Sequence, residues 1–198
     1  MTTLVVVLDA DVLVPILSCD LLLSAFDADL YRPVVTATIL EELERNLIDH
    51  FAHIDPAMLR RRVAQVAAAL SHHTHDEGDI TAVAVRSVNR KDRHVVATAL
   101  VHGADLVVSN DRRLRREIKT LDAPLRAVTG DEFAQRLLVD QPDRVDAVIG
   151  ALTAKRMRRP VTRNELIDHL AGNFPRFAAK LHRAGPMTGP PAAETLDR

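Results

Sequence analysis

The 198 residues are 47% hydrophobic and 27% charged, which is ordinary for a folded protein and too apolar for a disordered chain. Because 26 basic residues nearly balance 27 acidic ones, for a net charge of -1, any attraction to nucleic acid or to an anionic membrane must be local. No uncharged apolar run approaches the roughly 18 residues of a membrane span, and the sequence carries neither a secretory leader nor a cysteine pair, so we expect a cytoplasmic protein.

The amino-terminal half begins with an apolar segment, residues 4–8 (LVVVL), which is rich in β-branched side chains. This pattern is typical of a parallel strand that is buried on both faces. A helix over residues 12–23 should follow and begin near Pro15, because proline is tolerated at the start of a helix. The next predicted elements are a strand over 31–35, a helix over 39–51 opened by the capping-box spacing of Thr38 and Glu41, and a helix over 58–70.

The segment from residue 92 to residue 139 alternates in the same way. Asp92 is predicted to cap a helix over residues 92–100, and Gly103 suits its end. Strands that alternate with helices predict an α/β fold with a parallel sheet. The remaining elements are a strand over 104–109, a basic helix over 112–121, a strand over 125–128, and a helix over 133–139 preceded by the capping-box spacing of Thr129 and Glu132.

From Pro142 onward the pattern is purely helical, with another capping box at Thr162 and Glu165. We therefore divide the chain into a core domain over residues 1–140, a helical extension over 141–184 and a tail over 185–198. The tail is rich in glycine and proline and is predicted to be disordered.

Four acidic residues are expected to meet at one edge of the sheet. Asp9 ends the first strand and Asp111 follows the strand over 104–109, and parallel sheets bind ligands beyond such strand ends. Glu42 lies in the first turns of a helix, and Asp92 lies at the start of another. Carboxylates brought together repel one another unless a cation neutralises them, and oxygen ligands favour Mg²⁺ or Mn²⁺. Because such ions activate water for attack on a phosphodiester, the pattern indicates hydrolysis of nucleic acid.

Four segments, in this order, resemble the PIN domain family. They are VLDADVLV over residues 7–14, ILEEL over 39–43, KDRHVVATAL over 91–100 and ADLVVSNDRRL over 104–114. The resemblance spans roughly residues 5–128 and is strongest to VapC-type toxins of bacterial toxin-antitoxin modules, which include a branch with a helical C-terminal extension. It implies a three-layer α/β/α fold with a central parallel sheet of four or five strands, followed by that extension.

The resemblance also implies a set of site residues. Ser109 matches a hydroxyl position that supports the site. Asp11 stands where Asn is commoner, so it stays open whether Asp11 adds a fifth ligand, and Glu41 and Glu44 leave the register of Glu42 open. The residues that match the catalytic and metal-binding acids of the family are Asp9, Glu42, Asp92 and Asp111.

The activity implied by the resemblance is that of a Mg²⁺- or Mn²⁺-dependent endoribonuclease, selective for single strands, that cleaves structured RNA such as tRNA or rRNA. Inhibition by a cognate antitoxin protein and formation of a homodimer are implied as well, and the number of metal ions stays open. Arg93, Arg112 and Arg113 flank two of the acids and are candidates for binding substrate phosphates.

Simpler interpretations compete with this one. Taken singly, Asp9 suits a turn, Asp92 a helix cap, and each arginine a solvated helix face. A strand that ends in Asp9-Ala-Asp11 also begins haloacid-dehalogenase-type phosphatases, with Asp9 as the nucleophile, although Leu13 stands where that family has Thr. The non-enzymatic alternative is a PIN-like scaffold that binds RNA or protein without cleaving it.

Overall fold

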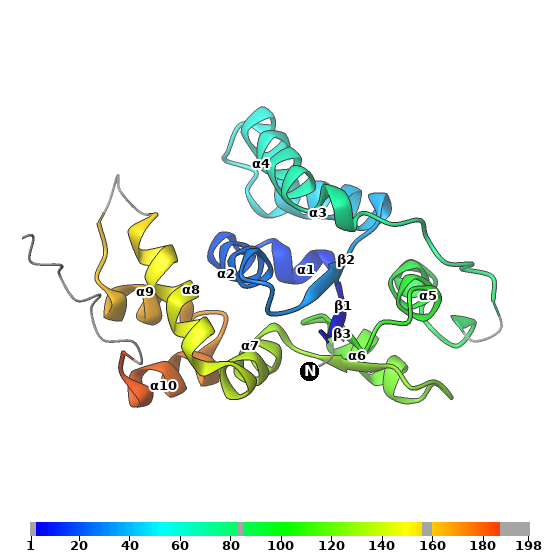
Figure 1. Ribbon diagram of the computed structural model, residues 1–198. Helices are drawn as coiled ribbons and strands as arrows, with labels where there is room; N and C mark the ends of the chain where they lie inside the picture. Colours follow the sequence, from blue (N-terminus) through cyan, green and yellow to red (C-terminus); the bar gives the residue numbers. More distant parts are fainter. Residues whose placement is uncertain (1–2, 83–84, 156–159, 187–198) are drawn as a thin grey trace, which may run out of the picture.

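A central sheet of four parallel strands organises the computed structural model, which describes residues 3–82, 85–155 and 160–186 (Figure 1). The order of the strands across the sheet is β2-β1-β3-β4. The predicted α/β fold with four or five parallel strands is therefore confirmed, with four. The strands are β1 Val5–Leu8, β2 Arg32–Val34, β3 Leu106–Val108 and β4 Arg126–Val128.

The two central strands are buried on both faces. Val6, Val7 and Leu8 of β1 have no exposed surface, and all of β3 is buried beside them. Val7 pairs with Val107, and the two strands run parallel, so both end at the same edge of the sheet. The continuous apolar runs predicted this burial, because a parallel strand covered by helices has no face that needs polar side chains.

Helices cover the sheet in the arrangement of an α/β/α protein. In the view of Figure 1, α1 to α4 lie above the sheet, and α6 and α7 lie below it. Helix α5 packs against both central strands, β1 and β3. The helices of this core are α1 Ala10–Leu13, α2 Ile16–Asp27, α3 Ala37–His50, α4 Pro56–Ala69, α5 Arg93–Val101, α6 Arg112–Lys119 and α7 Gly130–Asp140, with short 3-10 helices η1 Ser71–His73 and η3 Arg90–Asp92.

One predicted helix start is confirmed and another is wrong. The helix expected to begin near Pro15 is α2, which begins at Ile16 after the extended backbone of Pro15, and a separate short helix, α1, precedes it. Helix α3 is capped by Thr36 and not by a capping box at Thr38, since the Thr36 hydroxyl accepts the backbone N–H of Ile39. The capping box at Thr129 is confirmed.

The helical extension consists of α8 Pro142–Ala154, α9 Arg163–Leu170 and α10 Pro175–Ala184. Helix α8 packs against α2 and α7, and α10 packs against α7 and α9. Phe174, Phe177 and Leu181 are buried in the same hydrophobic cluster as the strands. The predicted boundary at residue 140 stays a prediction. Most of the predicted tail, residues 187–198, lies outside the described residues.

In the described part of the chain, none of the helices combines the length and apolarity that crossing a membrane requires.

Candidate metal centre

Asp9 and Asp111 lie directly beyond two neighbouring strands, β1 and β3, and each begins a helix. Oδ1 of Asp9 accepts the backbone N–H of Ala10 at 2.7 Å, at the start of α1. Oδ1 of Asp111 accepts the backbone N–H groups of Arg113 at 2.6 Å and Leu114 at 3.2 Å, at the start of α6. Asp9 therefore caps α1, and this contact holds its carboxylate at the edge where ligands bind parallel sheets.

Asp11 is tied to the end of β3 by hydrogen bonds. Its Oδ2 accepts the backbone N–H of Asn110 at 2.8 Å. The fully buried Ser109 hydroxyl donates to Oδ2 of Asp11 at 3.3 Å and accepts the backbone N–H of Asp111 at 3.0 Å. Ser109 therefore links the loop after β1 to the loop after β3.

Glu42 faces a histidine that the sequence interpretation did not single out. Oε2 of Glu42, on α3, lies 3.4 Å from Nε2 of His94, on α5, which is 8% exposed. This charged contact is longer than an ordinary hydrogen bond. In the sequence, His94 could have been noticed only because it lies two residues after Asp92. Its contact with Glu42 on α3 cannot be read from the sequence.

Asp92 is buried, with 8% of its surface exposed, and stands at the junction of η3 and α5. The prediction that it caps α5 is wrong, because its side chain makes no capping hydrogen bond. Its Oδ2 is buried and has no hydrogen-bond partner. An unsatisfied buried carboxylate oxygen costs free energy, and native structures keep such atoms mainly where a ligand or an ion binds.

Burial and mutual repulsion shift the pKa values of these acids. Burial, with the charge of Asp11, raises the pKa of Asp9 to about 7. Burial also raises the pKa values of Asp11 and Asp92. The pKa of Glu42 is lowered by its contact with His94. Each of these acids is repelled by two others, so the five form a ring of mutually repelling neighbours. The order in the ring is Asp9, Asp11, Asp111, Asp92, Glu42 and back to Asp9.

The donor set fits a hard divalent cation in its chemistry. All five members of the ring offer carboxylate oxygens, which Mg²⁺ and Mn²⁺ prefer. A cation would relieve the repulsion that raises the pKa values and would satisfy Oδ2 of Asp92. Among the residues that the structure describes, no group of three or more His, Cys, Asp or Glu side chains is placed closely enough to hold an ion. The acids therefore share an electrostatic site without forming a closed cage.

Comparison with known protein families shows to which family the chain belongs. The PIN domain family matches it over residues 5–113, which is more than half of its length. The chain belongs to the PIN-domain family. The four matching acids and Ser109 all lie inside the matched region, and the parallel pairing of β1 and β3 brings Asp9, Ser109 and Asp111 to one edge of the sheet.

A Mycobacterium tuberculosis (strain ATCC 25618 / H37Rv) protein named "Putative ribonuclease VapC50" is 30% identical to this chain over 112 residues. The alignment covers 54% of this chain and 64% of the relative, so this chain spans less than two thirds of the length of that relative. No solved structure matches the chain. The similarity of this PIN domain to VapC-type proteins, expected from its four motifs, is confirmed.

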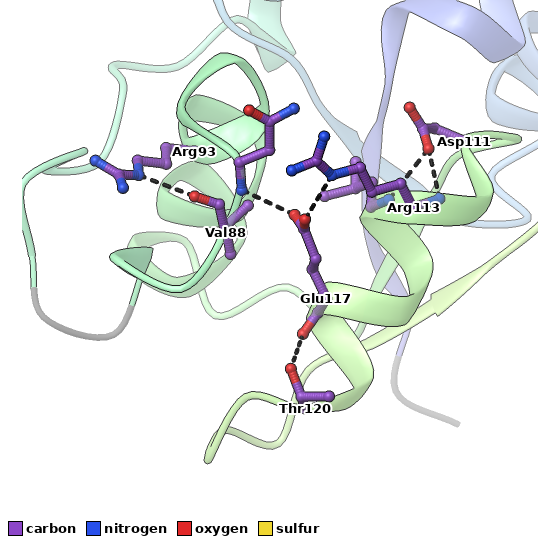
Figure 2. A network of polar contacts seen from close by, with 8 residues as sticks. Val88, Arg93, Asp111, Arg113, Glu117 and Thr120 are labelled. Carbon is purple, nitrogen blue, oxygen red and sulfur yellow. Dashed lines mark hydrogen bonds and ion pairs between the residues drawn. The ribbon is translucent and has the colours of Figure 1, made fainter.

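The arginines that flank the acids of the PIN domain differ in their surroundings. The Arg93 guanidinium donates to the backbone carbonyl of Val88 at 3.0 Å (Figure 2). It also donates to the backbone carbonyl of Arg86 at 2.9 Å, so Arg93 braces a loop. Nε of Arg113 donates to Oε1 of Glu117 at 2.8 Å. Arg112 is exposed on α6. Arg112 and Arg113 therefore keep more freedom to meet a phosphate than Arg93 does.

Proposed function

We propose that this PIN domain is a metal-dependent endoribonuclease that hydrolyses RNA phosphodiester bonds. Asp9, Glu42, Asp92 and Asp111 would hold Mg²⁺ or Mn²⁺. The observation that carries the proposal is Oδ2 of Asp92, a buried oxygen without a partner inside a ring of repelling carboxylates. A site of this kind is tolerable when a doubly charged ion occupies it.

The ion and the surrounding residues would have different roles in such a site. A bound divalent ion supplies a Lewis acid and a more acidic water for attack on phosphorus. Ser109 and the backbone of Asn110 hold Asp11, so this fifth carboxylate stays next to Asp111 as a ligand or as a neighbour. His94 holds Glu42 from α5 and keeps its carboxylate ionised. The positive charge of the ion would lower the pKa of Asp9 and keep it ionised at neutral pH.

The family resemblance supports finer proposals about partners. We assign the chain to the toxin component of a VapBC-type system, since the relative it resembles carries a VapC ribonuclease name. The substrate would be structured RNA such as tRNA or rRNA, and a cognate antitoxin protein would inhibit the enzyme. We also propose a homodimer and a cytoplasmic location.

Family membership favours the nuclease over a haloacid-dehalogenase-type phosphatase. In such a phosphatase Asp9 would be the nucleophile, whereas the matched family over residues 5–113 is the PIN domain. A covalent aspartyl-phosphate trapped on Asp9 would reverse this preference.

The test is cleavage of single-stranded and structured RNA by antitoxin-free protein. Activity should appear with Mg²⁺ or Mn²⁺, disappear with a chelator, and fall by at least about a hundredfold in Asp9→Asn and Asp92→Asn variants. The exposed Asp122→Asn variant is the matched control and should cleave like the parent protein. Full activity in Asp9→Asn would defeat the assignment, and RNA binding without cleavage or metal binding would indicate a scaffold.

A further inference from the structure

Glu117 lies beyond the residues matched by the PIN domain and belongs to none of the motifs, yet it contacts Asn89 and Arg113, which flank two of the acids. It lies on α6, and its side chain is 19% exposed. Its Oε2 accepts the backbone N–H of Asn89 at 2.8 Å, and its Oε1 accepts Nε of Arg113 at 2.8 Å (Figure 2). Both carboxylate oxygens are thus engaged within the protein.

The contact with Asn89 reaches the segment that carries Asp92. Asn89 begins the 3-10 turn η3, and the backbone N–H of Asp92 donates to the carbonyl of Asn89 at 2.9 Å. Asp92 has no capping hydrogen bond from its side chain to fix it in place. The position of its carboxylate therefore depends on how the turn from Asn89 to Asp92 is held.

Helix α6 links this turn to another acid of the ring. Asp111 caps the amino terminus of α6, and Glu117 holds η3 from the same helix. One rigid helix thereby relates the positions of Asp111 and Asp92, which come from different loops. Burial alone would raise the pKa of Glu117, but the Asn89 N–H and Arg113 outweigh it and lower that pKa, so the anchor is charged.

We propose that Glu117 is a positioning residue, which anchors the turn at Asn89 and so holds Asp92 where it can share a cation with Asp111. This inference rests on the proposed metal-dependent function and deepens it. We assign Glu117 no role as a ligand, because its two oxygens accept hydrogen bonds from Asn89 and Arg113 and it belongs to none of the motifs. Residues that orient ligands in this way commonly change metal affinity by about ten- to a hundredfold when they are removed.

The first test measures the affinity for Mn²⁺ alone by calorimetry on the full chain. Glu117→Ala should weaken binding by roughly tenfold or more, whereas Glu117→Gln keeps an acceptor for the Asn89 N–H and should recover most of the affinity. Glu165→Ala is the matched control, because Glu165 also accepts a backbone N–H at the start of a helix, that of Thr162 at 2.7 Å. This control should lose stability but keep its Mn²⁺ affinity.

Two results of this first test would overturn the inference. They are an unchanged Mn²⁺ affinity in Glu117→Ala, and an equal loss in the Gln and Ala variants, which would make the charge of Glu117 the important property.

A second measurement separates this inference from the proposed function. Amide hydrogen exchange of the metal-free chain at Asn89 and Asp92 should become roughly tenfold faster in Glu117→Ala. If the parent chain fails to bind Mn²⁺, the proposed function is refuted, and the exchange result alone then decides whether Glu117 holds the turn. Unchanged exchange at both amides would overturn the anchoring role.

Discussion

His94 and Glu42 form a half-buried charged pair between α5 and α3, with 3.4 Å between Nε2 and Oε2. The contact lowers the pKa of Glu42 below its ordinary value of 4.5. Burial opposes the charged form of His94, but Glu42 and Asp9 outweigh burial and raise its pKa above 6.5. The pair therefore favours an ionised Glu42, which is the form that a cation needs.

The pair should contribute stability in a defined pH window. The contribution of Glu42 is lost as the pH falls through its lowered pKa, and that of His94 is lost as the pH rises through its raised pKa. His94→Gln should therefore reduce the free energy of unfolding by about 1 kcal/mol, and most strongly between the ordinary values of pH 4.5 and 6.5. Denaturant unfolding of the metal-free chain across pH measures this effect.

The control for this experiment is His182→Gln, which removes an exposed contact of 2.8 Å to Asp168. It should show little loss of stability, since exposed ion pairs contribute little. The same small, pH-independent loss in His94→Gln would contradict the prediction.

Asp9 should make the metal-free protein less stable as the pH rises. Its pKa is about 7 in the folded chain against an ordinary 3.8, so between these values the folded state binds a proton that the unfolded state has released. The stability that protonated Asp9 contributes is fully present below pH 3.8 and is lost as the pH rises through about 7. Since each pKa unit corresponds to about 1.4 kcal/mol, the loss is on the order of 4 kcal/mol.

Asp9→Asn should remove this loss, because the amide keeps an acceptor for the Ala10 N–H and carries no charge. Chemical unfolding with a chelator should find the variant more stable than the parent at pH 8, with the difference shrinking toward pH 4. The exposed Asp122→Asn variant should keep the slope of the parent. A parent protein whose stability does not change between pH 4 and pH 8 would disprove the prediction.

The sequence predicted the sheet and the acids that follow its strands. Asp9 and Asp111 could be identified from the sequence because each follows a buried apolar run. Parallel pairing of the two strands then brings both residues to one edge of the sheet. The start of α3 was predicted wrongly. The capping-box spacing pointed to Thr38, whereas the extended backbone at Thr36 makes Thr36 the cap.

The supporting shell of the site was not predictable in the same way. His94, Glu117 and Asn110 act through contacts with residues that are far away in the sequence. Neither periodicity nor capping rules report such contacts. For Asp92 the sequence predicted both a helix cap and a metal ligand, and the capping role is wrong because its side chain makes no capping hydrogen bond and its Oδ2 has no partner.

Asp92 should couple metal binding to stability. When a divalent ion is present at about a hundred times its dissociation constant, a site in the folded state gains about 2.7 kcal/mol. Mn²⁺ should therefore raise the melting temperature of the parent chain and have little effect on Asp92→Asn, which loses the ligand and relieves its repulsion with Asp111 and Glu42. Thermal unfolding with and without Mn²⁺ is the measurement.

Asp143→Asn, at an exposed position in the first turn of α8, should respond to Mn²⁺ as the parent does. If Asp92→Asn were stabilised as much as the parent, Asp92 would not be a ligand.

Gly78 supports α5 by allowing a backbone approach that no other residue permits. A Cβ added at Gly78 would lie 2.2 Å from the carbonyl oxygen of Ala97, in the helix that also carries His94. Since this oxygen belongs to a helical backbone, the clash can be relieved only by moving α5 or the loop. Gly78→Ala should therefore destabilise the protein by about 1–3 kcal/mol.

Gly150→Ala is the matched control, because a Cβ at Gly150, within α8, would meet nothing within 4 Å. There the same substitution should stabilise the protein, by up to about 1 kcal/mol from helix propensity. The two glycines should thus respond with opposite signs in denaturant unfolding. Because α5 directly follows Asp92, a displacement of α5 should also move Asp92. Gly78→Ala should therefore weaken Mn²⁺ binding, while Gly150→Ala leaves it unchanged. A stable Gly78→Ala protein with the Mn²⁺ affinity of the parent would show that the loop and α5 do not meet in this way.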